Sequence, residues 1–177
     1  MKKILVIGSG GSGKSTFSAQ LGKQLHMPVI HLDAHYWQPG WVEPTKAQWL
    51  ARVHELCQGE QWVMDGNYSG TLVPRLAACD TVIFLDLPRL LCLWRVLSRS
   101  LRYWGQTRPD MAEGCPEQFS PEFWCWIWNY PRDSRPRALA LIEKNAAGKH
   151  IIRLRSAQAV RQFLANSSSA AVQEVSV

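Results

Sequence analysis

The sequence predicts an α/β fold, a three-layer sandwich in which a parallel sheet lies between two layers of helices. Short apolar runs followed by stretches with helical periodicity recur along the chain, and this alternation is typical of parallel strands joined by crossover helices. At 177 residues the chain suits one domain with its own core and room for a small inserted lid. A glycine-rich motif directly after the first apolar run supports the same fold class.

The expected strands are five apolar runs, at residues 4–7, 29–32, 62–64, 82–85 and 151–154. The expected helices cover residues 16–26, 45–58, 89–103 and 136–147, because each of these stretches carries one apolar stripe. A threonine in a capping position, Thr45, opens the second of them. The pattern therefore predicts a domain over residues 1–165.

Two segments depart from this pattern. Residues 104–120 bring two glycines and two prolines close together, so they read as an irregular loop. Long irregular loops in compact domains are often lids, and we expect a lid at about residues 103–121. Residues 166–177 are rich in serine and alanine without periodicity, which predicts a disordered tail.

The composition narrows the class of protein. Five cysteines without a C-x-x-C pair argue against a disulfide framework and a zinc ribbon. A net charge of +6 suits a protein that handles polyanions, and both nucleotides and nucleic acid qualify. Nine tryptophans favour a stacking or lid-like site, although core packing explains large apolar side chains equally well. No run of about 18 uncharged apolar residues occurs, so we expect a cytoplasmic protein without membrane span or signal peptide.

The glycine-rich motif reads G-S-G-G-S-G-K-S and fits G-x-x-x-x-G-K-[ST], the Walker A phosphate loop (P-loop). Its glycines let backbone N–H groups turn inward around an anion at the start of a helix. We expect Lys14 to reach the β- and γ-phosphates and the Ser15 hydroxyl to bind Mg²⁺. The sequence thus predicts binding of ATP or GTP by Gly8, Ser9, Gly10, Gly11, Ser12, Gly13, Lys14, Ser15 and Thr16.

An acid follows the second expected strand. Asp33 is a candidate to take the proton of an acceptor hydroxyl or to hold a Mg²⁺-bound water, with a turn-capping role as the alternative. His35 is either a substrate contact or a structural histidine. Trp37, within a run of aromatic residues, is expected to stack on a flat substrate or to form part of the core wall.

The end of the third expected strand carries a second acid. Asp65 is a candidate to orient Mg²⁺ through water, and the alternative is an ordinary D-G turn. Gly66 allows close approach of a ligand to the backbone, and Tyr68 stands beside it as a candidate substrate contact. Arg75 is expected either to clamp an anionic group of the acceptor or to be a solvated helix residue.

A basic run follows the fourth expected strand. Arg95, Arg99 and Arg102 share one helix face, with no acid among the neighbouring arginines. Phosphoryl transfer needs positive charge on the migrating group, and arginines of a closing lid supply it. We therefore assign Arg95, Arg99 and the later Arg135 to stabilising that charge, while a nucleic-acid-binding helix and a solvated face remain alternatives.

Several of these motifs together resemble a known family. G-S-G-G-S-G-K-S-T, H-L-D-A-H-Y-W-Q-P-G-W, D-G-N-Y, V-I-F-L-D-L-P-R and T-R-P-D-M-A-E-G-C-P-E are similar to the bacterial topology modulation (FlaR-related) proteins. That family belongs with the phosphate-loop kinases of the adenylate-kinase and shikimate-kinase kind. The resemblance implies a five-stranded parallel sheet in the order 2-3-1-4-5 and a lid insertion.

The resemblance also implies roles for single residues. Arg95 and Arg99 resemble the helix arginines that lead into the kinases' lid. Asp33 resembles the acid after the second strand of shikimate kinases, but His35 replaces the second acid of that pair. The segment that begins at Asp65 lacks the arginine of the adenylate kinase D-G-F-P-R motif, which Arg75 would have to replace. Neither shikimate nor a nucleoside monophosphate is therefore favoured as the acceptor.

The sequence as a whole predicts transfer of a phosphoryl group from ATP, with Mg²⁺, to a small molecule such as a nucleoside, nucleotide or polyol. Two other functions remain open. One is a nucleotide-binding regulator that influences DNA topology, supported by the basic helix. The other is an NTPase that works without an acceptor.

Overall fold

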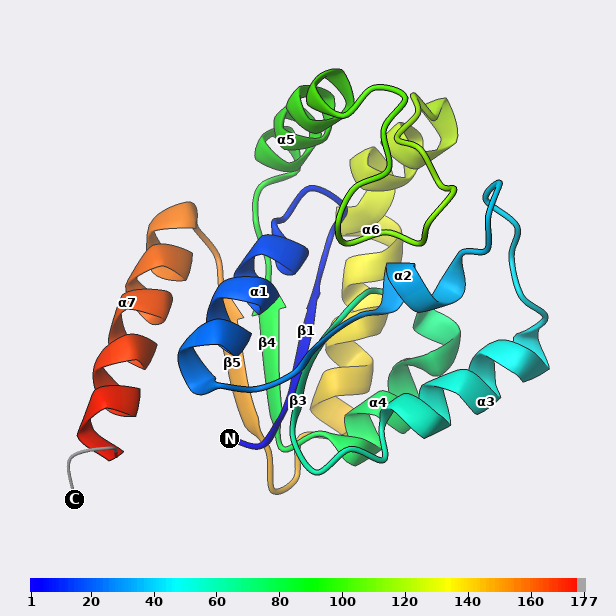
Figure 1. Ribbon diagram of the computed structural model, residues 1–177. Helices are drawn as coiled ribbons and strands as arrows, with labels where there is room; N and C mark the ends of the chain where they lie inside the picture. The colour runs from blue at the N-terminus through cyan, green and yellow to red at the C-terminus, as the bar shows by residue number, and fades with distance from the viewer. Residues whose placement is uncertain (175–177) are drawn as a thin grey trace.

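The computed structural model describes residues 1–174 as a three-layer α/β sandwich (Figure 1). Its sheet is parallel throughout, in the order β2-β3-β1-β4-β5, which confirms the predicted topology. The strands are β1 (Lys3–Gly8), β2 (Val29–His31), β3 (Trp62–Asp65), β4 (Thr81–Leu85) and β5 (His150–Leu154). Each expected strand is thus present, and parallel pairing brings the carboxyl ends of all five to one edge of the sheet.

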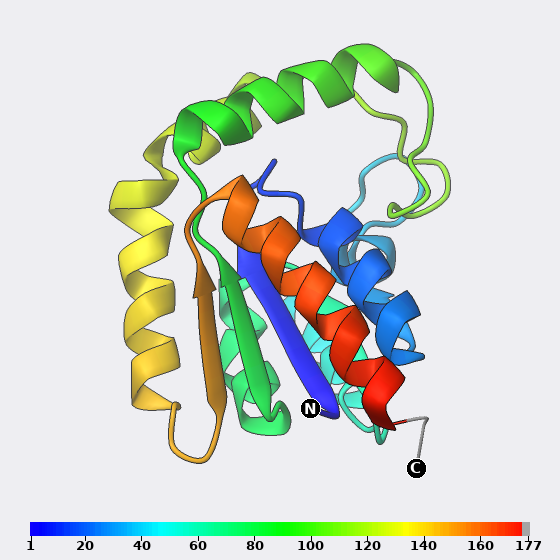
Figure 2. The ribbon, with the colours of Figure 1, turned by 90° about the vertical axis from the view of Figure 1, so that its left-hand side faces the viewer.

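Helices cover both faces of the sheet, as Figures 1 and 2 show. One face carries α1 (Lys14–Leu25) and α7 (Ala157–Glu174), and the other carries α3 (Lys46–Leu56), α4 (Leu72–Ala78) and α6 (Pro121–Lys144). The remaining elements lie near the carboxyl edge of the sheet: α2 (Leu32–Tyr36), the 3₁₀ turn η1 (Ser69–Thr71) and α5 (Arg89–Arg102).

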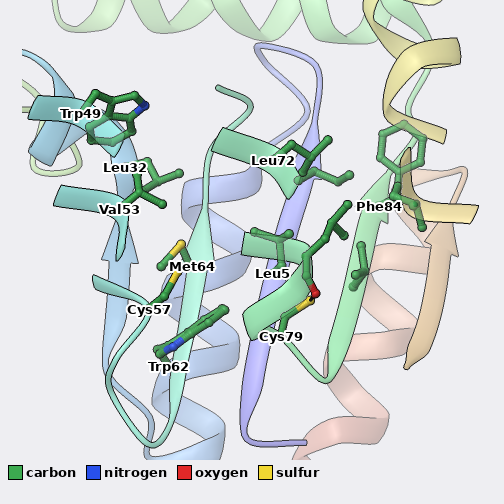
Figure 3. Close-up of a cluster of buried hydrophobic side chains, with 14 of the residues drawn as sticks. Leu5, Leu32, Trp49, Val53, Cys57, Trp62, Met64, Leu72, Cys79 and Phe84 are labelled. Atoms are coloured by element: carbon green, nitrogen blue, oxygen red, sulfur yellow. Dashed lines mark hydrogen bonds between the residues drawn. The ribbon is translucent and has the colours of Figure 1, made fainter. Parts of the chain in front are cut away.

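The central strand β1 is buried on both faces and divides the core in two. Leu5 and Ile7 face α3, α4 and α6, where Trp49 of α3 and Leu72 of α4 join the same cluster (Figure 3). The alternate residues of β1 face α1 and α7. Apolar side chains on both faces are the reason why this strand reads as a continuous hydrophobic run.

Helix α6 begins well before the predicted helix 136–147. The Ser120 hydroxyl accepts a hydrogen bond from the Phe123 backbone N–H, and Pro121 opens the first turn. Pro131 and Pro136 lie inside the helix, where the missing N–H groups normally argue against helix. The packing of buried Ile127 and other residues of α6 outweighs this local preference.

Helix α7 covers a segment for which the sequence predicts no helix. The sequence predicts a disordered tail over residues 166–177, whereas the structure continues α7 to Glu174, and residues 175–177 lie outside the described residues. Phe163 packs on Phe17 of α1 with ring centroids 5.9 Å apart, and this contact holds α7 against α1. None of the helices within residues 1–174 is both long and apolar enough to span a membrane.

The segment 103–120 connects α5 to α6 as an irregular loop (Figure 1). Isolated bridges join Trp104 to Glu117 and Thr107 to Pro116, so the loop folds back on itself. This is the segment in which the sequence predicts a lid.

Candidate active site

The phosphate loop connects the end of β1 to the start of α1. Gly11 and Gly13 have φ angles of 72° and 89°, a left-handed conformation that glycine adopts without strain. A Cβ on Gly11 would lie 2.2 Å from the Cys92 carbonyl oxygen, so α5 packs too closely for any side chain there. No side chain of the described residues caps the N-terminus of α1, which leaves its first N–H groups available to an anion.

Buried polar atoms in this loop indicate that it fits phosphate. The hydroxyls of Ser9 and Ser12 are buried and have no hydrogen-bond partner among the described residues. Such groups are costly unless water or a ligand satisfies them, and Ser12 is the one of the two that lines the cavity described below. Lys14 Nζ donates to the Ser9 carbonyl oxygen over 3.0 Å. Burial lowers the pKa of Lys14, and the charges of Asp33 and Asp65 oppose this shift.

Ser15 and Asp65, the two residues that the sequence proposes for the metal, lie close together. The Ser15 hydroxyl is 3.5 Å from Asp65 Oδ1, and Asp65 is 4% exposed at the end of β3. Hydroxyl and carboxylate oxygens suit Mg²⁺, which keeps several waters and is held mainly through substrate phosphates. Among the side chains that the structure describes, no cluster of three or more acids, histidines or cysteines is arranged to bind a metal. The pair thus fits an ion that phosphate oxygens help to hold.

His31 is a site residue for which sequence reasoning gave no role. Its Nδ1 lies 2.6 Å from Asp65 Oδ2, and this hydrogen bond raises the pKa of His31 although burial opposes the shift. His31 pairs with Asp65 in the register of β2 on β3. The sequence offers one signal for this contact. His31 and Asp65 are the last residues of two neighbouring parallel strands, and such residues lie side by side.

Asp33 and Tyr68 face the same cavity from two different elements. Asp33 is in the first turn of α2, and the Tyr68 hydroxyl donates to its Oδ1 over 2.6 Å. Burial raises the pKa of Tyr68, with the nearby Asp33 charge adding to the shift, so the hydroxyl stays protonated. Tyr68 is therefore a fixed donor that orients the Asp33 carboxylate.

A cavity of about 1450 Å³ joins the phosphate loop to these residues. The ends of β2 and β3, the helix α5, the 103–120 loop and the first half of α6 form its walls. Aromatic side chains line it on the side of Asp33 and α6, namely Trp37, Trp41, Tyr68, Phe123, Trp126 and Tyr130. The predicted stacking residue Trp37 is thus in the cavity, and Trp126 and Tyr130 were not anticipated.

The residues after β3 bring the backbone close to the site. Gly66 has a φ angle of 145° and lines the cavity, and a Cβ there would lie 2.8 Å from Leu32 Cβ. Asn67, which sequence reasoning did not assign, accepts a hydrogen bond from the Gly8 N–H at 3.2 Å. This bond ties the end of β3 to the start of the phosphate loop.

Two predicted arginines of α5 lie beside the phosphate loop. Arg95 Nη1 donates to the Ser12 carbonyl oxygen over 3.1 Å, and Arg99 donates to Glu117. Both arginines line the cavity, as do two acids of the 103–120 loop that sequence reasoning left out, Asp110 and Glu117.

The two roles considered for Arg75 are both wrong. Its side chain is fully buried, and its guanidinium donates to the carbonyl oxygens of Thr71, Gly66, Asn67 and Tyr68 at 2.8–3.1 Å. Burial lowers its pKa to about 10. Arg75 therefore holds the chain that leaves β3, and it is neither a clamp for an anionic acceptor nor a solvated helix residue.

Two other predicted residues lie outside the cavity. Arg135 forms a two-pronged ion pair with Asp86, at 2.8 and 3.1 Å, so the prediction that it stabilises migrating charge is corrected. His35 Nδ1 lies 3.3 Å from Arg52 Nη2. His35 does not line the cavity, so it is not placed to contact a substrate there. Burial and the neighbouring Arg52 charge lower the pKa of His35.

Comparisons with known proteins identify the fold. A scan of protein-family models and a search of curated proteins gave no match, so the resemblance to topology modulation proteins finds no support there. Among solved structures, a shikimate kinase from Acinetobacter baumannii in complex with shikimate matches with a TM-score of 0.60 and 15% identity. The match covers 98% of this chain and 94% of that chain.

Two further solved structures match over nearly the whole chain. A gluconokinase from Sinorhizobium meliloti 1021 has a TM-score of 0.52 and 15% identity, with 97% of this chain and 92% of that chain covered. A deoxyadenosine kinase from M. mycoides with bound dATP has a TM-score of 0.51 and 14% identity, with 94% and 98% covered. At these identities the likeness concerns the fold, and this chain therefore has the fold of phosphate-loop small-molecule kinases.

Proposed function

We propose that this protein transfers the γ-phosphoryl group of ATP to a hydroxyl group of a small molecule. The proposal rests on one observation: the phosphate loop and the Asp33 carboxylate line the same cavity. The phosphate loop, with Ser15 against Asp65, forms one wall, and the Asp33 carboxylate held by Tyr68 faces the same space. A donor for phosphates and a base for an acceptor are the two parts that this reaction needs.

The phosphate side binds and orients the donor. Backbone N–H groups of the loop, Lys14 and the orphaned serine hydroxyls suit phosphate oxygens. Mg²⁺ bound by Ser15 and Asp65 would offset the negative charge of the phosphates. Lys14, Arg95 and Arg99 stabilise charge that develops on the phosphoryl oxygens, because they line the cavity beside the loop.

The acceptor side supplies the base. Asp33 takes the proton of the acceptor hydroxyl while the hydroxyl oxygen bonds to the γ-phosphorus and the bond to the β,γ-bridging oxygen breaks. Tyr68 keeps the carboxylate in one orientation by donating to Oδ1. The other carboxylate oxygen of Asp33 is then the atom to accept the proton.

The walls of the cavity favour an acceptor that carries hydroxyl groups and no phosphate. Aromatic side chains on the Asp33 side suit a flat or ring-shaped molecule. Arg75, the residue that would have recognised an acceptor phosphate, donates to four backbone carbonyl oxygens. The proposal is therefore of a nucleoside or polyol acceptor rather than a nucleoside monophosphate. Among the similar structures, the deoxyadenosine kinase is named for a nucleoside, and the shikimate kinase and the gluconokinase are named for hydroxy acids.

We favour this function over nucleic-acid binding because the basic run is engaged inside the site. Arg95 donates to the phosphate loop, and Arg99 and Arg108 pair with acids of the 103–120 loop. Because the side chains of Arg99 and Arg108 are largely buried, they present little surface to the backbone of a nucleic acid.

The test is consumption of ATP by the purified protein with Mg²⁺, measured against nucleosides, nucleoside monophosphates, sugars and small hydroxy acids. We expect one uncharged, hydroxyl-bearing compound to raise the rate well above that without acceptor, and Lys14→Ala to remove the rise. ATP turnover that no acceptor changes would instead identify an NTPase. Tight ATP binding without turnover would favour a regulatory protein and would direct the search to DNA and protein partners.

A further inference from the structure

Glu117 is a buried carboxylate at the point where the 103–120 loop meets α5. It is 6% exposed and lines the cavity. Its Oε1 accepts from Arg99 Nε and Nη2 at 3.2 and 3.1 Å and from the Ser100 hydroxyl at 2.9 Å. Its Oε2 lies 2.7 Å from Arg108 Nε. Burying an acid is costly unless it is paired, and here one acid pairs with two arginines from two segments, with Arg99 through hydrogen bonds and with Arg108 through an ion pair.

The two arginines keep donors for a ligand. A guanidinium has five N–H groups on three nitrogens. Glu117 takes the Nε and Nη2 of Arg99, and Arg108 places its Nη1 on Asp110 at 2.9–3.0 Å. Among residues 1–167, whose side chains the structure describes, neither Arg99 Nη1 nor Arg108 Nη2 has a hydrogen-bond partner. Since both side chains line the cavity, each has a terminal nitrogen left for an oxyanion.

The backbone of Glu117 is fixed independently of its side chain. Its N–H donates to the Gln106 carbonyl oxygen at 2.8 Å, and its own carbonyl oxygen accepts from the Gly105 N–H at 3.2 Å. Just before it, the Pro116 carbonyl oxygen accepts from Trp41 Nε1 at 3.2 Å, and the Gly114 carbonyl oxygen accepts from the Gly40 N–H at 2.9 Å. The loop is therefore attached both to α5 and to the turn that carries the aromatic wall.

We propose that Glu117 is a positioning residue that directs Arg99 and Arg108 onto the γ-phosphate of the bound nucleotide. The inference rests on the proposed phosphoryl transfer and assigns a function to an acid that the reaction itself does not use. It predicts that Glu117 matters for a nucleotide with a γ-phosphate and not for one without it. A carboxylate that only stabilised the loop would affect both nucleotides alike.

The experiment compares the binding of two nucleotides by calorimetry in the presence of Mg²⁺: ADP and the β,γ-imido analogue of ATP. For Glu117→Gln we expect the affinity for the ATP analogue to fall about tenfold, as for loss of charge-assisted hydrogen bonds, while the ADP affinity stays within about twofold. Glu117→Asp keeps the charge and should restore part of the difference. Glu113→Gln, at an exposed acid of the same loop, is the matched control and should change neither affinity.

Several results would overturn the inference. Equal weakening of both nucleotides by Glu117→Gln, or no weakening of either, would leave Glu117 a purely structural residue while the proposed function stands. Failure of the unmodified protein to bind either nucleotide would remove the proposed function and this inference with it. If Glu117→Gln does not fold by circular dichroism, Ser100→Ala removes one donor to the same carboxylate. That variant should shift the ratio of affinities in the same direction by a smaller factor, and an unchanged ratio would contradict us.

Discussion

The two sides of the cavity differ in how the chain builds them. The phosphate loop is a single segment between β1 and α1, and its shape follows from local glycine conformations. The acceptor side is assembled from the ends of β2 and β3, the 103–120 loop and α6, which are far apart in sequence. A site made of one segment can therefore be identified from its motif, whereas a site made of several segments depends on which side chains the packing brings into contact.

The same difference divides the arginines. Arg95 and Arg99 lie one helical turn apart on α5 and both reach the cavity. The sequence places Arg75 and Arg135 in the site as well. In the structure, Arg75 is buried and donates to backbone carbonyl oxygens, and Arg135 is paired with Asp86. Substitutions at these positions therefore test whether the contrast between the two groups is real.

Lys14→Ala should have the largest effect. Removing a charge from the phosphate side should lower the rate of acceptor-dependent ATP consumption about a thousandfold. The fold should remain intact, since Lys14 Nζ donates to a single protein group, the Ser9 carbonyl oxygen. The measurement is steady-state phosphoryl transfer together with thermal unfolding. Lys23→Ala, an exposed residue of the same helix, is the control. Full activity of Lys14→Ala would refute the assignment of the phosphate site.

Asp33→Asn tests the acceptor side in the same assay. The amide keeps the shape of the side chain but cannot take a proton at neutral pH, so the rate of transfer should fall about a hundredfold. ATP affinity should be unchanged because the phosphate loop is untouched. The exposed acid Asp133 of α6 provides a control, Asp133→Asn, that should leave the rate as it is. A parallel loss of ATP affinity would instead place Asp33 in the metal site.

Arg75→Ala separates a structural arginine from a functional one. Four carbonyl oxygens would lose a buried charged donor, and we expect the free energy of unfolding to fall by about 3 kcal/mol. Denaturant titration measures this loss. Arg52→Ala, at a half-exposed ion pair with Glu55, should lower it by no more than about 0.5 kcal/mol. If Arg75→Ala keeps its stability but loses activity with an anionic acceptor, the clamp that we rejected is restored.

The fold and the phosphate site could be predicted because their signals are local. The apolar runs predict every strand, and the glycine motif predicts the phosphate loop. The strand order follows from the family resemblance. The helix over Pro121–Lys144 was found only in part, since packing overrides the local preference of Pro131 and Pro136. The pairing of His31 with Asp65 needs the register of β2 on β3, and the partners of Glu117 need the path of a loop. Neither is encoded in a short motif.

Arg135→Ala should have the smallest effect on activity. It tests an arginine that lies outside the cavity. Because Arg135 pairs with Asp86 outside the cavity, transfer should stay within about twofold of the unmodified rate. Stability should fall by about 1 kcal/mol at neutral pH, since Arg153 remains beside Asp86. A rate loss as large as that of Lys14→Ala would show that Arg135 leaves Asp86 to bind phosphate.

The pH dependence of this small loss identifies its origin. Burial works to raise the pKa of Asp86, but the hydrogen bonds and charges of Arg135 and Arg153 outweigh it and hold the pKa below its usual value. A depressed carboxyl pKa adds stability above the unfolded pKa and loses it as the pH falls through the folded one. The stability difference between the protein and Arg135→Ala should therefore be constant near neutrality and shrink below about pH 4. A difference that does not change with pH would mean that Arg135 stabilises α6 by packing and not through its charge.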